Sequence, residues 1–244
     1  MSHCLSGGSR RGSALIRPAW FDCPVPEPDY AAIRQAYESA PLHEQDLQPE
    51  PMSQFNEWFA QAVEAGLPEP NAMTLATVDE ANRPCARTVL LKGVDTRGFA
   101  FATNYHSRKG TQIAGNSAVA LVFLWLPLAR QVCVRGTAVP APREQSQAYF
   151  ASRPREHQLG AWASAQSQPI GDRQTLQDAY ARAAQEFPGT VPTPEHWGIY
   201  IVEPESIEFW QGQSSRLHDR LEYMRTAPGG IDDPAAWSLR RLSP

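Results

Sequence analysis

Apolar residues near the start of the chain recur at helical spacing. Between residues 52 and 67 they form a single stripe, made of Phe55, Trp58, Phe59, Ala62 and Val63. A spacing of three and four residues predicts an amphipathic helix, which Gly66 and the prolines after it would end. The same spacing predicts a shorter helix over residues 30–37.

From residue 72 the pattern changes to a period of two, which is typical of strands. Polar turns at 79–82 and 95–98 divide the first runs into hairpins. The predicted strands cover residues 72–77, 87–92, 99–103, 118–125, 131–139, 198–202, 207–210, 217–225 and 237–242. Two further helices are predicted, over residues 142–150 and 175–187.

Strands this close along a chain pair antiparallel. So many in succession, with helices only between or beside them, favour a mainly β fold with peripheral helices, built on a closed antiparallel barrel rather than a parallel sheet. No linker or internal repeat divides the pattern, so we predict one domain over residues 29–244 with an N-terminal helical extension. Residues 1–28 are expected to be a disordered tail, with a transit peptide as the weaker alternative.

Composition narrows the class of protein. The formal net charge of -4 argues against a general binder of nucleic acids or acidic membranes. The longest apolar run has twelve residues, 118–129, fewer than the roughly 20 that a membrane span needs. The four cysteines show no disulfide or metal-ligand spacing, which predicts free thiols in a reducing cytoplasm and no metal site.

Positive charge is concentrated in one stretch of the chain. Residues 1–82 carry four Arg and twelve Asp or Glu, whereas residues 83–135 carry eight Arg or Lys and a single acid, Asp95. This asymmetry predicts a local anion site; a solvated basic face is the alternative.

The segment from Ser107 to Gly110 is one candidate for that site. Ser107 is a suitable N-cap, and Arg108 and Lys109 would then lie in the first turn of a helix. Cations are misplaced there because the helix dipole is already positive, unless a bound phosphate reverses the cost. Two solvated cations, at about 0.3 to 1 kcal/mol each, are the alternative.

A second candidate is the strand from Arg87 to Lys92. Alternation places Arg87, Val89 and Leu91 on one face and Thr88, Leu90 and Lys92 on the other, so the two cations could serve different anions. A barrel strand with solvated rims has the same pattern.

Six groups of residues stand in one order between residue 30 and the C-terminus. They are Arg87-Thr-Val-Leu-Leu-Lys92, Thr103-Asn104 with Ser107-Arg108-Lys109, Arg130-Gln131-Val132, Tyr149-Phe-Ala-Ser-Arg153-Pro-Arg155, Gly160-Ala-Trp-Ala-Ser164 with Gln166-Ser167, and Glu208-Phe-Trp210 with Arg216-Leu-His218-Asp-Arg220. Together they resemble the pyridoxine/pyridoxamine 5'-phosphate oxidase family of flavoproteins. The resemblance implies an FMN-binding split β-barrel, antiparallel and Greek-key-like, that forms a homodimer.

The resemblance also implies that FMN binds in clefts at the subunit interface, with several contacts from the partner chain. The residues that match the family's cofactor contacts are Arg87, Thr88, Val89, Leu90, Lys92, Ala102, Thr103, Arg108, Lys109, Gln131, Gln166, Ser167, Trp210 and Arg220. Ala102 stands where the family often has a tyrosine.

For the substrate, the resemblance implies a phosphate site at Lys92, Tyr149, Arg153 and His157, where the family usually has serine at the last position. Tyr149 and Arg153 are four apart and would share a face if the helix extends that far.

The substrate ring would lie against Arg216 and His218, the matches to the family's catalytic residues. On the predicted strand these two alternate with Arg220, which would place three potential cations in a row. Arg34 and Tyr37 match a segment that can fold over the substrate as a lid.

The implied activity belongs to vitamin B6 metabolism. Pyridoxine 5'-phosphate or pyridoxamine 5'-phosphate would be oxidised to pyridoxal 5'-phosphate by hydride transfer from C4' to flavin N5. Oxygen is the final acceptor, hydrogen peroxide is released, and the amine also yields ammonia. Two alternatives remain: a split-barrel flavin oxidase of phenazine biosynthesis, and a non-catalytic protein that binds flavin or pyridoxal phosphate.

Overall fold

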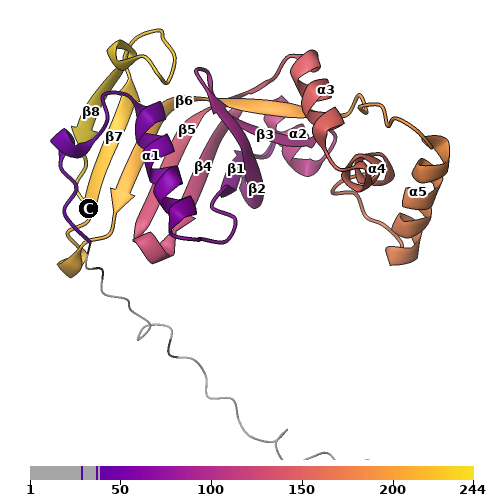
Figure 1. Ribbon diagram of the computed structural model, residues 1–244, viewed down its shortest axis with the longest axis horizontal. Helices are drawn as coiled ribbons and strands as arrows, with labels where there is room; N and C mark the ends of the chain where they lie inside the picture. The colour runs from indigo at the N-terminus through magenta and orange to yellow at the C-terminus, as the bar shows by residue number, and fades with distance from the viewer. Residues whose placement is uncertain (1–28, 30–36, 38) are drawn as a thin grey trace, which may run out of the picture. The chain divides into compact units, whose positions relative to one another are not determined.

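Eight strands form one antiparallel sheet in the computed structural model, which describes Asp29, Tyr37 and residues 39–244 (Figure 1). The strands are β1 Ala72–Val78, β2 Pro84–Asp95, β3 Gly98–Asn104, β4 Ala118–Trp125, β5 Arg130–Pro140, β6 Trp197–Gln211, β7 Asp219–Arg225 and β8 Trp237–Arg241. The predicted tail at 1–28, most of the helix predicted at 30–37, and Arg34 lie outside the described residues. Residues 36–244 belong to one compact unit.

Six of the strands close into a barrel. The sheet order is β3-β2-β1-β4-β5-β6-β7-β8, and β3 also pairs with β6. β4 returns beside β1 after the β1-β2-β3 meander, which gives the spatial order of a Greek key. The prediction of a mainly β fold with a closed antiparallel barrel is therefore confirmed.

The long strand β6 belongs to two parts of the sheet. Residues as far as Val202 pair with β3 and close the barrel, while residues from Ser206 onward pair with β7. β5 follows the whole length of β6, with a register shift between Arg135 and Gly136. A Cβ at Gly136 would lie 2.1 Å from the carbonyl oxygen of Glu203, so only glycine allows this close approach.

The prediction of two separate strands at 198–202 and 207–210 is therefore wrong. Pro204 and the glutamates beside it have the composition of a turn, but the proline falls where β6 changes neighbours on one edge. A missing N–H is tolerated at such a position.

Helices lie around the sheet (Figure 1). They are α1 Pro51–Glu64, α2 Arg108–Gly115, α3 Arg143–Ser152, α4 Arg155–Ala163 and α5 Arg173–Glu186, with short 3-10 turns η2 Glu44–Asp46, η3 Leu126–Leu128, η4 Ser214–Arg216 and η5 Pro234–Ala236. The pattern did not predict α4, in which Leu159 alone is fully buried. Within the described residues, no helix combines the length and the apolar character that crossing a membrane requires.

Helix α1 packs on the barrel core. Phe55, Trp58 and Ala62 are buried as predicted, whereas Val63 is 53% exposed and lies outside the buried stripe. The Phe55 ring meets Phe99 and Phe123 edge to face at 4.9 and 5.0 Å between centroids. A second apolar cluster lies under α3, α4 and α5, around Phe150, Leu159, Ala183, Val191 and Trp197.

Candidate functional site

A cavity of about 790 Å³ lies among β2, β3 and the helices α2, α3 and α4. This volume is in the range of small-molecule sites. Its lining includes eight of the expected cofactor residues: Thr88, Val89, Leu90, Lys92, Ala102, Thr103, Lys109 and Gln166. It also includes four of the expected substrate residues: Lys92, Tyr149, Arg153 and His157. We call it the cationic cavity, since Lys92, Lys109 and Arg153 all line it.

Lys109 occupies one side of the cationic cavity. Its Nζ donates to Oε1 of Gln166 at 3.0 Å, and the Thr103 hydroxyl approaches the same oxygen at 3.4 Å. Burial, and then the charge of Arg87, lower the pKa of Lys109. Both causes penalise the ammonium, and an anion at this position would relieve the penalty.

Lys109 owes its position to the start of α2. Ser107 is the N-cap, as predicted, and its Oγ accepts from the backbone N–H of Gly110 at 3.3 Å. Arg108, the next residue of the same turn, lines a separate hollow beside the β1–β2 turn. Of the two cations predicted at this helix start, only Lys109 reaches the cationic cavity.

Arg153 occupies another side of the cavity. Its guanidinium carbon lies 4.8 Å from the centre of the Trp197 ring, and its Nη1 is buried with no hydrogen-bond partner among the described residues. Burial lowers the pKa of Arg153, while Tyr149 acts in the opposite direction. A buried charged donor without an acceptor is costly, and an anion in the cavity would offset the charge of the guanidinium.

Tyr149 and Arg153 were expected to share a helical face only if the helix continued to Arg153, and it does not. Helix α3 ends at Ser152, and Arg153 is its extended C-cap, with φ -74° and ψ 150°. Pro154 follows directly, and a residue before proline is driven out of the helical region. The two side chains still meet at the same cavity because Tyr149 stacks on Trp197, the ring beneath Arg153, at 6.1 Å.

A second group of predicted residues forms an aromatic cluster of Tyr37, Trp210 and His218. Ring centroids are 5.8 Å apart for Tyr37 and Trp210, 5.9 Å for Tyr37 and His218, and 4.8 Å for Trp210 and His218. Gly212 makes this packing possible, since a Cβ there would lie 2.8 Å from the Tyr37 ring. Sequence reasoning missed Gly212, whose only signal was a glycine just after a predicted strand.

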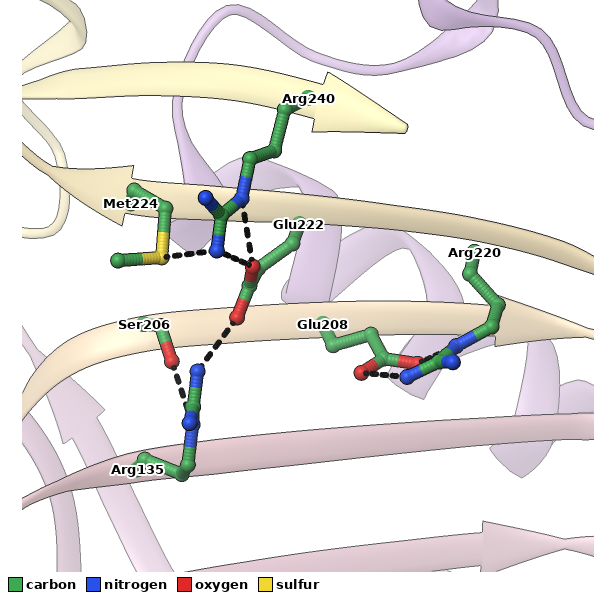
Figure 2. Close-up of polar contacts among 7 residues, drawn as sticks. All are labelled: Arg135, Ser206, Glu208, Arg220, Glu222, Met224 and Arg240. Atoms are coloured by element: carbon green, nitrogen blue, oxygen red, sulfur yellow. Dashed lines mark hydrogen bonds and ion pairs between the residues drawn. The ribbon is translucent and has the colours of Figure 1, made fainter. Parts of the chain in front are cut away.

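Gln131 and Arg220 flank Trp210 in the sheet. Cross-strand pairing places Gln131 beside Trp210 on β5 and Arg220 beside it on β7, so the three share a face. Glu208 holds Arg220 by two hydrogen bonds of 2.7 and 3.0 Å (Figure 2). Glu208 was part of a matched string but was not among the predicted site residues.

Arg216, His218 and Arg220 do not form the predicted row of cations. Residues 214–216 make the turn η4, in which Ser215 and Arg216 have positive φ of 56° and 61°, and β7 begins only at Asp219. Such backbone cannot continue a strand. Arg216 is exposed, while His218 is tied to the turn because its Nδ1 accepts from the Gln213 N–H at 3.0 Å.

The cationic cavity and the aromatic cluster lie at opposite ends of β6. Trp197, the first residue of β6, lines the cavity, and Trp210, near its last residue, belongs to the cluster. At about 3.3 Å per residue these positions are roughly 40 Å apart along the strand. In Figure 1, α3, α4 and α5 lie at one end of the sheet and β7 and β8 at the other. A single chain therefore does not bring Arg153 and His218 together.

Six of the expected cofactor residues lie outside the cavity lining: Arg87, Arg108, Gln131, Ser167, Trp210 and Arg220. Arg87 turns instead toward β1 and α2, where it bonds Thr77 and Gln112. Neither of these two polar residues was predicted, because a lone Thr in a strand and a lone Gln in a helix carry no signal of their own.

Comparison with known proteins identifies relatives of this chain. Residues 59–186 match the family model described as pyridoxamine 5'-phosphate oxidase, and residues 197–244 match the pyridoxine 5'-phosphate oxidase C-terminal dimerisation region. The pyridoxine/pyridoxamine 5'-phosphate oxidase of Thermobifida fusca is 51% identical over 88% of this chain and 98% of its own length. That of Rubrobacter xylanophilus is 52% identical over 88% and 97%.

Among solved structures, PhzG from Burkholderia lata 383, in complex with tetrahydrophenazine-1-carboxylic acid, is similar with a TM-score of 0.77 and 28% identity. The match covers 86% of this chain and all of that one.

Proposed function

This chain belongs to the pyridoxine/pyridoxamine 5'-phosphate oxidase family, and from that premise we propose that it uses FMN and oxygen to convert pyridoxine or pyridoxamine 5'-phosphate to pyridoxal 5'-phosphate. The observation that carries the proposal is Arg153, which lines the cavity and has a buried Nη1 with no acceptor among the described residues. A phosphorylated substrate in the cavity would supply negative charge beside this guanidinium.

The residues of the cationic cavity fit FMN. Lys92, Lys109 and Thr103 would hold its phosphate and ribityl chain, with Arg87 and Arg108 adding positive charge from the same region. FMN held by these residues would supply a two-electron acceptor for the hydride from C4' of the substrate, with oxygen as the final oxidant and hydrogen peroxide as its product. The protein contributes position, charge and exclusion of water.

The substrate phosphate would lie among Lys92, Tyr149, Arg153 and His157. His157 lies in the first turn of α4, where an anion is also favoured by the helix dipole. An imidazole can donate to a phosphate oxygen as a serine hydroxyl does, but it is larger. We therefore assign His157 to the phosphate site and not to the chemistry at C4'.

Arg216 and His218 would bind the substrate ring. In neutral His218 the proton is on Nε2, because Nδ1 accepts from the Gln213 N–H. The ring atom left for the substrate is then a donor. His218 therefore orients an oxygen or nitrogen of the substrate, and in this tautomer it cannot accept the proton that the hydroxyl or ammonium group on C4' releases.

A complete site requires two copies of the chain in this proposal. The cationic cavity of one copy and the aromatic cluster of a second copy would combine, since roughly 40 Å of β6 separates them within one chain. The match of residues 197–244 to a dimerisation region supports this arrangement, because Trp210, Arg216 and His218 fall within it.

Oxygen consumption distinguishes the candidate functions. We expect turnover with pyridoxine phosphate or pyridoxamine phosphate, and much less with unphosphorylated pyridoxine, in protein that is yellow and carries about one FMN per chain. The likeness to PhzG makes a phenazine-type oxidase the second candidate. That candidate predicts no dependence on the substrate phosphate, and a flavin-bound protein without turnover would show a binding role instead.

A further inference from the structure

Arg87 is held by a backbone carbonyl and two polar side chains. Its Nη1 donates to the Leu75 carbonyl at 3.1 Å and to the Thr77 hydroxyl at 2.7 Å, and its Nη2 donates to Oε1 of Gln112 at 2.9 Å. All three acceptors are neutral. By contrast, Arg135, Arg220, Arg240 and Arg241 of the same chain are paired with carboxylates. Arg87 therefore keeps an uncompensated positive charge while its position is fixed.

The proton arrangement around Arg87 is self-consistent. The Thr77 hydroxyl donates to Gln112 Oε1 at 2.7 Å, which leaves its oxygen lone pairs for Arg87. The Gln112 amide nitrogen donates to Sγ of Cys85 at 3.1 Å, so the amide oxygen faces the guanidinium. Thr77 is 2% exposed and Gln112 9% exposed. This buried pair has one favourable orientation, and that orientation presents two oxygens to Arg87.

Two of the five guanidinium donors remain. Nη1 uses both of its N–H groups, one for each of its two acceptors. Nη2 uses the N–H group that lies on the side of Nη1, because its acceptor, Gln112 Oε1, is adjacent to Thr77 Oγ1. The Nε–H and the second Nη2–H have no acceptor among the described residues, and they lie along the same edge. Parallel N–H groups on one edge match two oxygens of a phosphate.

The surroundings of Arg87 favour an anion. Burial lowers the pKa of Arg87, Cys85 acts in the opposite direction, and Arg108 lowers it further. Burial and then Arg87 lower the pKa of Lys109. Arg87 is thus close enough to each of the two cations of α2 to be repelled by it. Helix α2 carries Arg108, Lys109 and Gln112, so a single helix contributes two of the charges and the amide that orients the third.

We propose that Thr77 and Gln112 are positioning residues that aim the remaining edge of Arg87 at the phosphate of FMN, and that the preference of this chain for FMN over riboflavin depends on them. The inference rests on the proposed flavin site. It concerns only the phosphate end of the cofactor, because the two residues contact Arg87 and neither of them lines the cationic cavity. Binding of the flavin ring is accordingly unaffected.

Flavin titration of the full-length apoprotein tests the proposal. Dissociation constants for FMN and riboflavin are measured by quenching of flavin fluorescence. In Gln112→Leu and Thr77→Val we expect FMN binding to weaken about tenfold or more, as for loss of a charge-assisted phosphate contact, while riboflavin binding changes less than about twofold. Thr77→Ser keeps the hydroxyl and should retain the FMN preference. Gln174→Leu, on the exposed face of α5, is the matched glutamine control.

A double-variant series shows whether the two residues act through Arg87. Arg87→Ala should itself lose the FMN preference, and adding Gln112→Leu to it should cause no further loss. An equal loss of FMN and riboflavin binding in Gln112→Leu would indicate a merely structural role and overturn the inference. So would a further tenfold loss in the Arg87→Ala background. Thermal melting of each variant identifies any that fail to fold, and Thr77→Ser against Thr77→Val then decides.

The two proposals fail in different ways. Wild-type protein that binds neither flavin removes the proposed function, and the inference with it. Wild-type protein that prefers FMN, together with variants that keep the same preference, contradicts the positioning role alone.

Discussion

At the scale of single residues, the environment of each arginine separates structural from binding roles. Arg220 and Arg240 are neutralised by Glu208 and Glu222, and such pairs tie strands together (Figure 2). Arg153 has aromatic rings beneath it and a buried nitrogen without an acceptor. An unsatisfied buried charge is destabilising in the empty protein and becomes favourable when a phosphate binds.

Replacing Arg153 tests this assignment. In Arg153→Ala we expect the KM for the phosphorylated substrate to rise roughly 10- to 100-fold, since a hydrogen bond to a charged group contributes about 1.5 to 3 kcal/mol. The value of kcat should change much less, because Arg153 is assigned to the phosphate and not to the reacting C4' group. Steady-state oxygen consumption measures both. Arg155→Ala is the control, as Arg155 bonds the backbone carbonyls of Phe187 and Gly189 outside the cavity; an unaltered KM in Arg153→Ala would place the phosphate elsewhere.

At the scale of secondary-structure elements, most helices and strands could be predicted from hydrophobic period alone. α1 and the hairpin of β1 and β2 have strong periods and clear turns, and Ser107 is a recognisable cap. The failures were at β6 and η4, where tertiary pairing decides, and at α4, which buries only Leu159. Pro204 has the appearance of a break between two strands, but it is paired with β5 within one continuous strand. Arg216 alternates with His218 in the sequence, but its backbone is left-handed.

The candidate site was predictable only in part, for a related reason. Charged residues in the six matched groups pointed to the cationic cavity. Eleven of the predicted site residues line it. Thr77, Gln112 and Glu208 could not be recognised, because their importance comes from the arginine that each contacts. Contacts of this kind depend on strand register and helix docking, which a pattern of apolar residues does not specify.

Strands β5 to β8 are joined by a buried carboxylate whose charge depends on pH. Glu222 is 2% exposed and accepts from Arg135 at 2.8 Å and from Arg240 at 2.7 Å (Figure 2). Burial alone would raise the pKa of Glu222, but the hydrogen bonds from Arg240 and Arg135 outweigh it and lower the pKa below the ordinary 4.5. A carboxyl with a lowered folded-state pKa stabilises the native state above its unfolded pKa, and this stability is lost as pH falls through the folded pKa.

Glu222→Gln should therefore reduce the free energy of unfolding at neutral pH and flatten its decline in acid. Urea unfolding followed by tryptophan fluorescence between pH 7 and about pH 3 measures both effects. Glu64→Gln, at an exposed position of α1, serves for comparison and should leave the curve unchanged. A parallel acid limb in Glu222→Gln and wild type would show that this carboxylate does not control acid stability.

At the scale of the whole molecule, β6 connects two half-sites that one chain cannot join. The barrel end holds the cations of the cationic cavity, and the end with β7 and β8 holds Trp210 and His218. A symmetric dimer would place each half against the other half of its partner, giving two equivalent sites.

Mixing two variants, assayed at a substrate concentration so low that each alone has little activity, tests this shared site. Arg153→Ala damages the cationic cavity and Arg216→Ala damages the substrate-ring end. If each site uses both copies, a hybrid dimer has one intact site and one doubly damaged site. Refolding the two variants together in equal amounts should then recover about a quarter of wild-type activity, as random pairing in a twofold dimer predicts. Activity no greater than the sum of the separate variants would mean that each chain contains its whole site.

The closing of β3 onto β6 has a consequence for solubility. A sheet normally has two outer strands whose unpaired N–H and C=O groups can recruit strands from other molecules. Among the described strands, β8 is the one terminal strand of the sheet order, because β3 is paired with β2 on one side and with β6 on the other. That last strand has five residues and carries Arg240 and Arg241, a short and charged border of the type that resists aggregation. In strand order, the described sheet thus has one terminal strand, short and charged, where an open eight-stranded sheet would have two.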